Sequence, residues 1–282
     1  MVIASPAWSA PADMQAEAKA AFEAARHTKQ DGPADVRLNE QVALHVPANM
    51  TFIPPAEAKR ILHAFGNSPD PDTLGMVMPL GEESWFAVPR FVKSGYIKDD
   101  DARDWKADDM LDGLKKGTEA SNGERRKRGI PEMEVVGWVE PPTYDAGTHR
   151  LVWSAAARDK GAGADAEQGV NYNTYLLGRE GYLSMNFVTD RTTIESEKPV
   201  AKQLLAAVEF DKGKRYTDFN ASTDHMAEYG LAALVGGVAA KKLGLFALMA
   251  AFAAKFAKVI GVAAIGLIAG LRKLFRKDTS EA

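Results

Sequence analysis

The chain of 282 residues contains no cysteine. A disulfide framework, a thiolate metal site and a cysteine nucleophile are therefore all excluded. The absence of thiols also fits a protein that works outside the cytoplasm, where the surroundings oxidise them.

An excess of charge of one sign is lacking too, because 35 Lys and Arg residues and 38 Asp and Glu residues leave a net charge of −3. Nucleic-acid binding usually shows as a basic excess, so we expect no nucleic-acid partner. The charge is unevenly placed, since the segment from Lys241 onward holds eight basic residues and two acidic ones. The sequence therefore predicts an acidic body and a cationic tail.

The familiar catalytic motifs are also missing. The sequence has no H-E-x-x-H zinc motif, no G-x-S-x-G elbow, no Walker A loop and no G-x-G-x-x-G after a strand. No two histidines are four positions apart, so no helix face carries a pair of imidazole ligands. The histidines are His27, His45, His63, His149 and His225. We expect no metal and no cofactor, and the sequence favours a protein that is not an enzyme.

His149 is the best single candidate for a functional side chain. It stands at the start of a predicted strand beside Arg150 and close to Tyr144 and Asp145. An imidazole among such groups can exchange protons near neutral pH. The alternative interpretation is a histidine that only forms hydrogen bonds in a turn.

A second candidate region surrounds the predicted turn Gly178–Gly181. Tyr172, Asn173 and Arg179 are candidates for binding a small polar ligand or a carbohydrate, although tyrosine and asparagine are also ordinary strand residues. The densest group of carboxylates lies elsewhere, at Asp99, Asp100, Asp101, Asp104, Asp108 and Asp109. A calcium loop needs a tight glycine that this run lacks, so a solvated acidic helix cap is the simpler interpretation.

The tail from Tyr229 to Lys277 is apolar, rich in Ala and Gly, and interrupted by lysines. Phe252 to Leu271 is long enough to cross a hydrocarbon core of roughly 30 Å, and a basic run follows it. We expect a transmembrane anchor at 252–277, reached through an Ala/Gly-rich helical approach at 223–251. Its marker residues are Phe252, Lys255, Lys258, Gly266, Gly270, Arg272, Lys273, Arg276 and Lys277.

The tail leaves three arrangements open. Lys255 and Lys258 either reach the outer membrane boundary or belong to a cationic stripe along one continuous helix, and a helical hairpin is the third arrangement. Gly266 and Gly270 form a G-x-x-x-G pair that permits self-association.

The first residues, 1–12, resemble the end of a secretory signal, with Ala10 to Ala12 as an A-x-A-like cleavage site. An exported body combined with a basic C-terminus gives one orientation by the positive-inside rule. We expect a single-pass protein of the bacterial inner membrane, with the body in the periplasm and the C-terminus in the cytoplasm. The alternative for residues 1–12 is a disordered leader.

Hydrophobic periodicity predicts an α+β fold, in which an antiparallel sheet is covered by helices. Two hairpins are expected near 133–157 and 170–188, the first closed by a turn at 141–147 and the second by Gly178–Gly181, with an exposed connection at 158–169. A further strand is expected at 36–46. Helices are expected at 14–29, lying loosely on the surface, at 56–65, from about 107 to a stop at Gly117 before a loop at 118–129, and at 195–210. The domains are then a helical leader at 13–31 and a body at 32–222.

Several long runs resemble one known family. They include WFAVPRFVKSGYIKDDDARDWKADDMLDGLKKG, VVGWVEPPTYDAGTHRLVWS, NYNTYLLGREGYLSMN and GKRYTDFNASTDHMAEYGLAALVGG. Over roughly 32–277 the chain is similar to the domain of unknown function (DUF) 2167 family, uncharacterised bacterial proteins described as membrane-anchored. The resemblance implies an exported body with a C-terminal membrane segment, and it implies no activity and no catalytic residues.

The expected function is that of a membrane-anchored envelope protein whose body binds a partner or ligand. The lipid bilayer and an envelope protein are the expected partners. Two alternatives remain, an envelope hydrolase with a cleft near His149, and membrane assembly through the lysine-striped tail.

Overall fold

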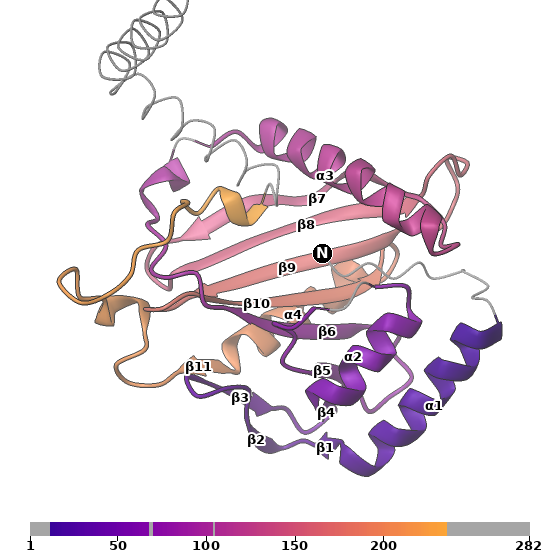
Figure 1. Cartoon of the computed structure of the whole chain (residues 1–282), viewed down its shortest axis with the longest axis horizontal. Coiled ribbons are helices and arrows are strands. Elements are labelled where there is room, and N and C mark those ends of the chain that lie inside the picture. Colours follow the sequence, from indigo (N-terminus) through magenta and orange to yellow (C-terminus); the bar gives the residue numbers. More distant parts are fainter. Residues whose placement is uncertain (1–11, 68–69, 104, 236–282) are drawn as a thin grey trace, which may run out of the picture.

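The computed structural model describes residues 12–67, 70–103 and 105–235. An antiparallel sheet of eight strands forms its centre, in the order β1-β4-β5-β6-β10-β9-β8-β7 (Figure 1). The strands are β1 (Gln30–Asp31), β4 (Met50–Ile53), β5 (Met76–Pro79), β6 (Phe86–Val92), β7 (Met133–Asp145), β8 (Arg150–Asp159), β9 (Gly169–Leu177) and β10 (Tyr182–Asp190). A second sheet of three strands has the order β11-β3-β2. It is formed by β2 (Ala34–Arg37), β3 (Val42–Val46) and β11 (Val208–Phe210).

The predicted α+β class is confirmed, as are the two hairpins. Strands β7, β8, β9 and β10 are consecutive neighbours, so they form the expected meander. The predicted turn at 141–147 is wrong over most of its length, because β7 continues to Asp145. The pairing of β7 with β8 shifts register three times, which lets Pro141 and Pro142 remain within the strand.

One face of the large sheet is covered by α4 (Ile194–Ala206) and by the small sheet. Strand residues alternate between faces, so Tyr172 on β9 and Phe187 on β10 point to this side and are almost completely buried. Trp85 stacks on Phe187 with ring centroids 4.9 Å apart. This layer is the largest hydrophobic cluster of the described residues.

The opposite face carries α1 (Ala12–Thr28) and α2 (Pro55–Ala64) toward one side and α3 (Ala107–Lys127) along β7 (Figure 1). Helix α2 confirms the predicted amphipathic helix, with Ile61 fully buried. The expectation that the N-terminal helix lies loosely on the surface is wrong. Ala21 and Ala25 of α1 are buried against α2, because small side chains let two helices approach closely.

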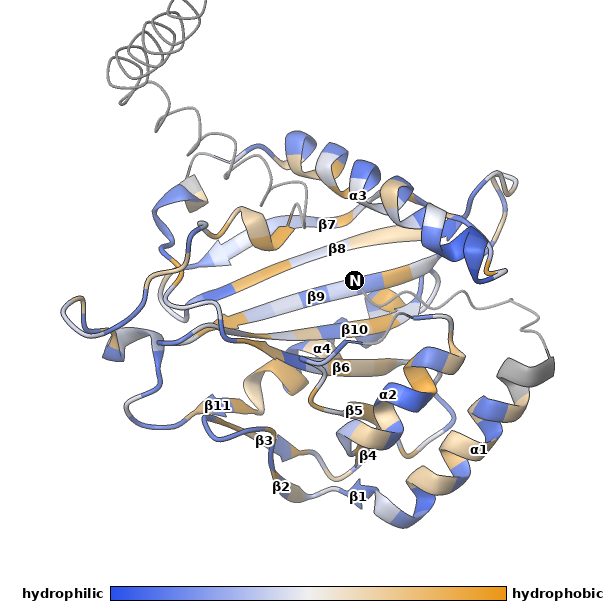
Figure 2. Cartoon of the chain, in the orientation of Figure 1, coloured by the Kyte–Doolittle hydropathy of each residue, from blue (hydrophilic) through white to orange (hydrophobic). Residues whose placement is uncertain are grey.

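Helix α3 is longer than predicted, since it continues through Gly117 and the expected loop at 118–129. Its buried positions recur every four residues and form a narrow stripe, while the rest of the helix is largely hydrophilic (Figure 2). These positions are Met110, Leu114, Thr118 and Asn122. Two of the four lie beyond Gly117, so their contacts offset the cost of about 1 kcal/mol that glycine adds inside a helix.

Two other boundaries differ from the predictions. The strand expected at 36–46 is two strands, β2 and β3, which form a hairpin because the side chain of Asn39 accepts hydrogen bonds from the backbone N–H groups of Gln41 and Val42. The helix expected at 195–210 ends at Ala206, and the residues after it form β11 against β3. Among the described residues, no helix has both the length and the apolar character needed to cross a membrane. The predicted anchor at 252–277 with its Gly266 and Gly270 pair, the approach beyond Val235 and nearly all of the signal remnant lie outside these residues.

Candidate functional site

His149 ends the turn between β7 and β8 in an unusual backbone conformation. Its φ angle is +53°, the only positive φ among the described residues other than glycine. The turn before it is fixed by Asp145, whose carboxylate accepts hydrogen bonds from the Gly147 N–H at 2.8 Å and the Thr148 hydroxyl at 2.7 Å. A residue other than glycine at positive φ costs of order 1 kcal/mol or more, so the surrounding contacts must hold His149 in this conformation.

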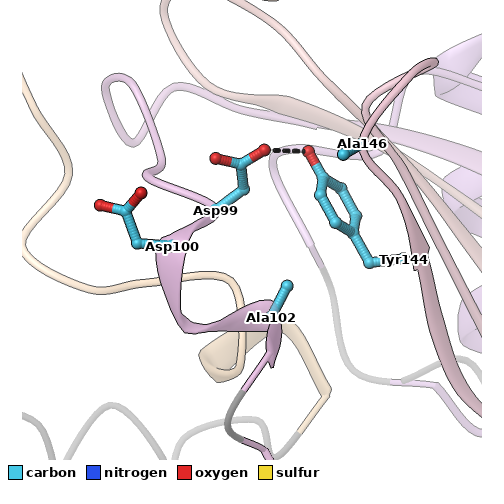
Figure 3. Close-up of a pocket in the computed structure, with 5 residues that line it drawn as sticks. All are labelled: Asp99, Asp100, Ala102, Tyr144 and Ala146. Carbon is cyan, nitrogen blue, oxygen red and sulfur yellow. Dashed lines mark hydrogen bonds between the residues drawn. The ribbon is translucent and has the colours of Figure 1, made fainter.

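The His149 side chain is held by aromatic and hydroxyl groups from distant segments. Its ring lies 4.2 Å from the ring of Tyr216, measured between centroids. Its Nδ1 is 3.3 Å from the hydroxyl of Tyr144, and that hydroxyl donates a hydrogen bond of 2.6 Å to Asp99 (Figure 3). Asp99, Tyr144 and His149 thus form a continuous polar chain, which we call the Asp–Tyr–His chain.

The hydrogen bonds of this chain fix where the protons lie. Burial, together with the neighbouring Asp99 carboxylate, raises the pKa of Tyr144 well above its usual range, so its hydroxyl keeps its proton. That single proton is donated to Asp99, which leaves the hydroxyl oxygen as an acceptor for His149. Nδ1 of His149 is therefore the donor in its contact with the Tyr144 hydroxyl, and Nε2 has no part in the chain.

A stack of aromatic rings supports His149 from the side. Tyr216 lies against His149, Tyr96 stacks on Tyr216 at 4.4 Å, and Phe219 stacks on Tyr96 at 3.8 Å. The Tyr216 hydroxyl donates a hydrogen bond of 2.9 Å to the carbonyl of Ile97. Burial raises the pKa of Tyr216, so this donor also stays protonated. The stack leaves the imidazole little freedom to rotate.

Two pockets adjoin the Asp–Tyr–His chain. The first, which we call the acidic pocket, has a volume of about 440 Å³ and is lined by Asp99, Asp100, Ala102, Tyr144 and Ala146 (Figure 3). The second, which we call the arginine pocket, has a volume of about 250 Å³ and includes His149, Arg150, Glu209, Arg215, Tyr216 and Thr217 in its lining. Tyr144 belongs to the first and His149 to the second, so their contact lies in the wall between the two.

The chain can be assigned to a family from its sequence over most of its length. The family model described as protein of unknown function (DUF2167) matches residues 30–266. The chain belongs to the DUF2167 family. This assignment agrees with the resemblance of the long sequence runs, and it adds no activity. No curated protein matches the sequence.

Solved structures resemble this DUF2167 protein only remotely. Cyanobacterial PsbP (CyanoP) from Synechocystis sp. PCC 6803 is 8% identical, with a TM-score of 0.37, over 60% of this chain and 86% of that chain. The Ran-binding protein Mog1p from Saccharomyces cerevisiae is 11% identical, with a TM-score of 0.33, over 62% and 94% of the two chains. These similarities are too low to transfer a partner or an activity.

The other predicted ligand-binding residues of the DUF2167 chain do not converge. Tyr172 and Asn173 are adjacent on β9 and therefore point to opposite faces of the sheet, where both are buried. Arg179 lies in the turn after β9 and forms two hydrogen bonds with Asp224, at 2.6 and 2.8 Å. It also donates to the carbonyl of Gly213, so its guanidinium tethers the segment 213–224 to the sheet.

The acidic run is a solvated helix cap only in its second part, where Asp108 and Asp109 are exposed in the first turn of α3. Its first part bonds to distant segments. Asp99 accepts from Tyr144, and Asp101 accepts from the backbone N–H groups of Leu231 and Ala232, both at 3.1 Å. Among the described side chains there is no group of three or more potential ligands that could hold a metal. The run therefore connects distant parts of the body.

The sequence predicts His149 as a candidate and places Tyr144 near it, but it gives no sign of their contacts with Asp99 and Tyr216. Asp99 is 45 positions from Tyr144, and nothing in the acidic run distinguishes it from its neighbours. Tyr216 precedes a polar segment in which no periodicity marks it as buried.

Proposed function

We propose that this protein is a membrane-anchored bacterial envelope protein whose α+β body binds a ligand or partner around His149. The apolar tail with its basic end supports the anchor, and the signal-like first residues support export. The single observation that carries the binding site is the strained His149, held between two pockets by the Asp–Tyr–His chain.

Several features of the site favour recognition. Backbone strain concentrates at functional positions, because the surrounding contacts must hold the residue there. Nδ1 is the donor to Tyr144, so Nε2 is the ring nitrogen left for a ligand. The Tyr216 ring lies against the imidazole, so little side-chain entropy remains to be lost on binding.

A second function, hydrolysis of an envelope substrate, is favoured by one observation. The Asp99 carboxylate lies 4.0 Å from Nδ1 of His149, and the Tyr144 hydroxyl contacts the same nitrogen, so both groups orient the ring. Nε2 then has the properties of a general base. A binding site is the simpler proposal, because hydrolysis also requires a nucleophile and binding does not.

The anchor is tested by separating membranes from the soluble fraction after alkaline carbonate extraction. The full chain should remain with the membranes, and a chain ending at Val235 should be released. Release of the full chain with its tail shown intact by mass spectrometry would contradict the anchor.

The binding site is tested by native mass spectrometry of the full chain purified from its own membranes. A species bound to the wild type should be lost from His149→Ala and kept by His45→Ala. His45 is a suitable control because it is exposed and pairs only with Asp35 among the described residues, at 2.6 Å. Equal occupancy in all three proteins, or no bound species in any, would contradict the proposal.

A further inference from the structure

We propose that the arginine pocket binds a phosphate group, with Arg150 as its main contact and Arg215 as a second cation. This proposal deepens the proposed function and rests on it, because the pocket shares His149 with the proposed binding site. Its volume is about 250 Å³, whereas the pockets that hold drug-sized ligands measure about 300–1,000 Å³. The arginine pocket therefore suits a small group, such as the charged part of a ligand.

Arg150 has donors that the described protein groups do not use. Its Nε is buried and has no hydrogen-bond partner among the described residues. One terminal nitrogen, Nη2, lies 3.5 Å from the carbonyl of Leu205, at the limit of a hydrogen bond. A buried donor without an acceptor is unfavourable, so an acceptor supplied by a ligand would relieve this cost.

The nearest carboxylate on the paired strand does not satisfy Arg150. Asp145 is its register partner on β7, and the two charges attract. The Asp145 oxygens, however, accept from the Gly147 N–H and the Thr148 hydroxyl. Asp145 thus fixes the turn, and the Nε of Arg150 keeps no hydrogen-bond partner among the described residues.

Arg215 adds a second positive charge that a ligand can recruit. It pairs with Glu209 at 2.7 Å, but both side chains are more than half exposed. Exposed ion pairs of this kind contribute about 0–1 kcal/mol, so a more highly charged group can displace Glu209. Two guanidinium groups around one small pocket match a phosphate, which carries about two negative charges and several acceptor oxygens.

The phosphate has two possible sources, a lipid headgroup and a soluble phosphate compound. The probe is inorganic phosphate, titrated by calorimetry into the full chain in a non-ionic, phosphate-free detergent at constant ionic strength. We expect Arg150→Gln to weaken phosphate binding about 10- to 100-fold, because the variant loses charged hydrogen bonds from the guanidinium to the phosphate oxygens. Arg150→Lys keeps the positive charge but loses the planar pair of guanidinium donors, so the affinity of this variant for phosphate should be intermediate.

Arg158→Gln is the matched control, because Arg158 lies at the other end of β8 and pairs with Glu134 at 2.7 Å. It should bind phosphate within about twofold of the wild type. Folding of each variant is checked by circular dichroism. Equal affinity of the wild type and a folded Arg150→Gln or Arg150→Lys protein would overturn the proposal, as would absence of phosphate binding by the wild type.

Competition identifies the source. Displacement of inorganic phosphate by phosphatidylglycerol added to the micelles would support a lipid headgroup, and displacement only by glycerol phosphate would support a soluble compound. Failure of this proposal is distinguishable from failure of the proposed function. A bound species lost from His149→Ala, together with phosphate binding that ignores Arg150, would leave the site in place and remove only the phosphate assignment.

Discussion

Asn122 joins helix α3 to the start of β7, and its replacement is a direct test of how the long helix is held. Its side chain is fully buried and forms hydrogen bonds with both backbone groups of Met133 on the strand. The amide nitrogen donates to the Met133 carbonyl at 2.9 Å, and the amide oxygen accepts from the Met133 N–H at 2.9 Å. Asn122→Ala removes both partners at once.

The expected loss of stability follows from the burial of these groups. Met133 is 1% exposed, so water cannot easily replace the amide. Each of the two buried backbone groups left unpaired costs about 1–3 kcal/mol, so we expect a loss of about 2–6 kcal/mol in the free energy of unfolding. For a domain of this size the melting temperature should fall by roughly 4–24 °C.

Urea unfolding followed by circular dichroism measures the change, with Ser121→Ala as the control. Ser121 lies on the same helix and its hydroxyl bonds only within the helix, to the Thr118 carbonyl at 2.7 Å. The control should stay within about 0.5 kcal/mol of the wild type. The reasoning is refuted if the urea midpoint of Asn122→Ala falls no further than that of Ser121→Ala at an unchanged slope.

Three further predictions concern individual backbone and charged positions. Gly117→Ala should raise the free energy of unfolding by about 0.5–1 kcal/mol in the same urea assay, because an added Cβ meets nothing within 4 Å and glycine is a poor helix former; a decrease would contradict this. Gly95→Ala should lower it by about 1–3 kcal/mol, because φ is +87° and the Cβ would lie 2.7 Å from the His225 carbonyl oxygen; a melting temperature equal to that of the wild type would count against the strain. Arg179 holds the pKa of Asp224 well below its usual range, so Asp224 stabilises the fold above the unfolded pKa of about 3.9 and this contribution is lost as the pH falls through the folded value; Asp224→Asn should be less stable than the wild type at neutral pH, the gap should narrow below about pH 4, and a gap independent of pH would refute the linkage.

Hydrophobic periodicity located the elements whose own side chains define a face. Helix α2 and the strands of both hairpins follow from local patterns, and the structure confirms them. Helix α3 beyond Gly117 does not follow, because its second half has few large apolar residues. The contact that holds it, between Asn122 and Met133, joins two elements and has no local signature.

The candidate site shows the same division. The side chains around the turn before β8 make His149 the candidate that the sequence predicts. Its conformation depends on Tyr216, whose hydroxyl donates to the Ile97 carbonyl 119 positions away. The sequence marks Arg150 only as a neighbour of His149. In the structure Asp145 accepts hydrogen bonds within the turn, and the Nε of Arg150 has no partner among the described residues. Sequence patterns therefore identified the segment, and long-range contacts decide which of its groups are available to a ligand.

The acidic run at 99–101 links this site to the end of the described chain. Asp99 bonds to Tyr144, while Asp101, two residues later, caps the turn that begins at Leu231. A Cβ at Gly230 would meet the Asp101 carboxylate, so a larger residue there would displace this side chain from the turn that it caps. Leu231 is fully buried in the hydrophobic cluster that also contains Tyr216. The last described residues thus pack on the side that holds the candidate site, and the position of Asp99 depends on how that segment is packed.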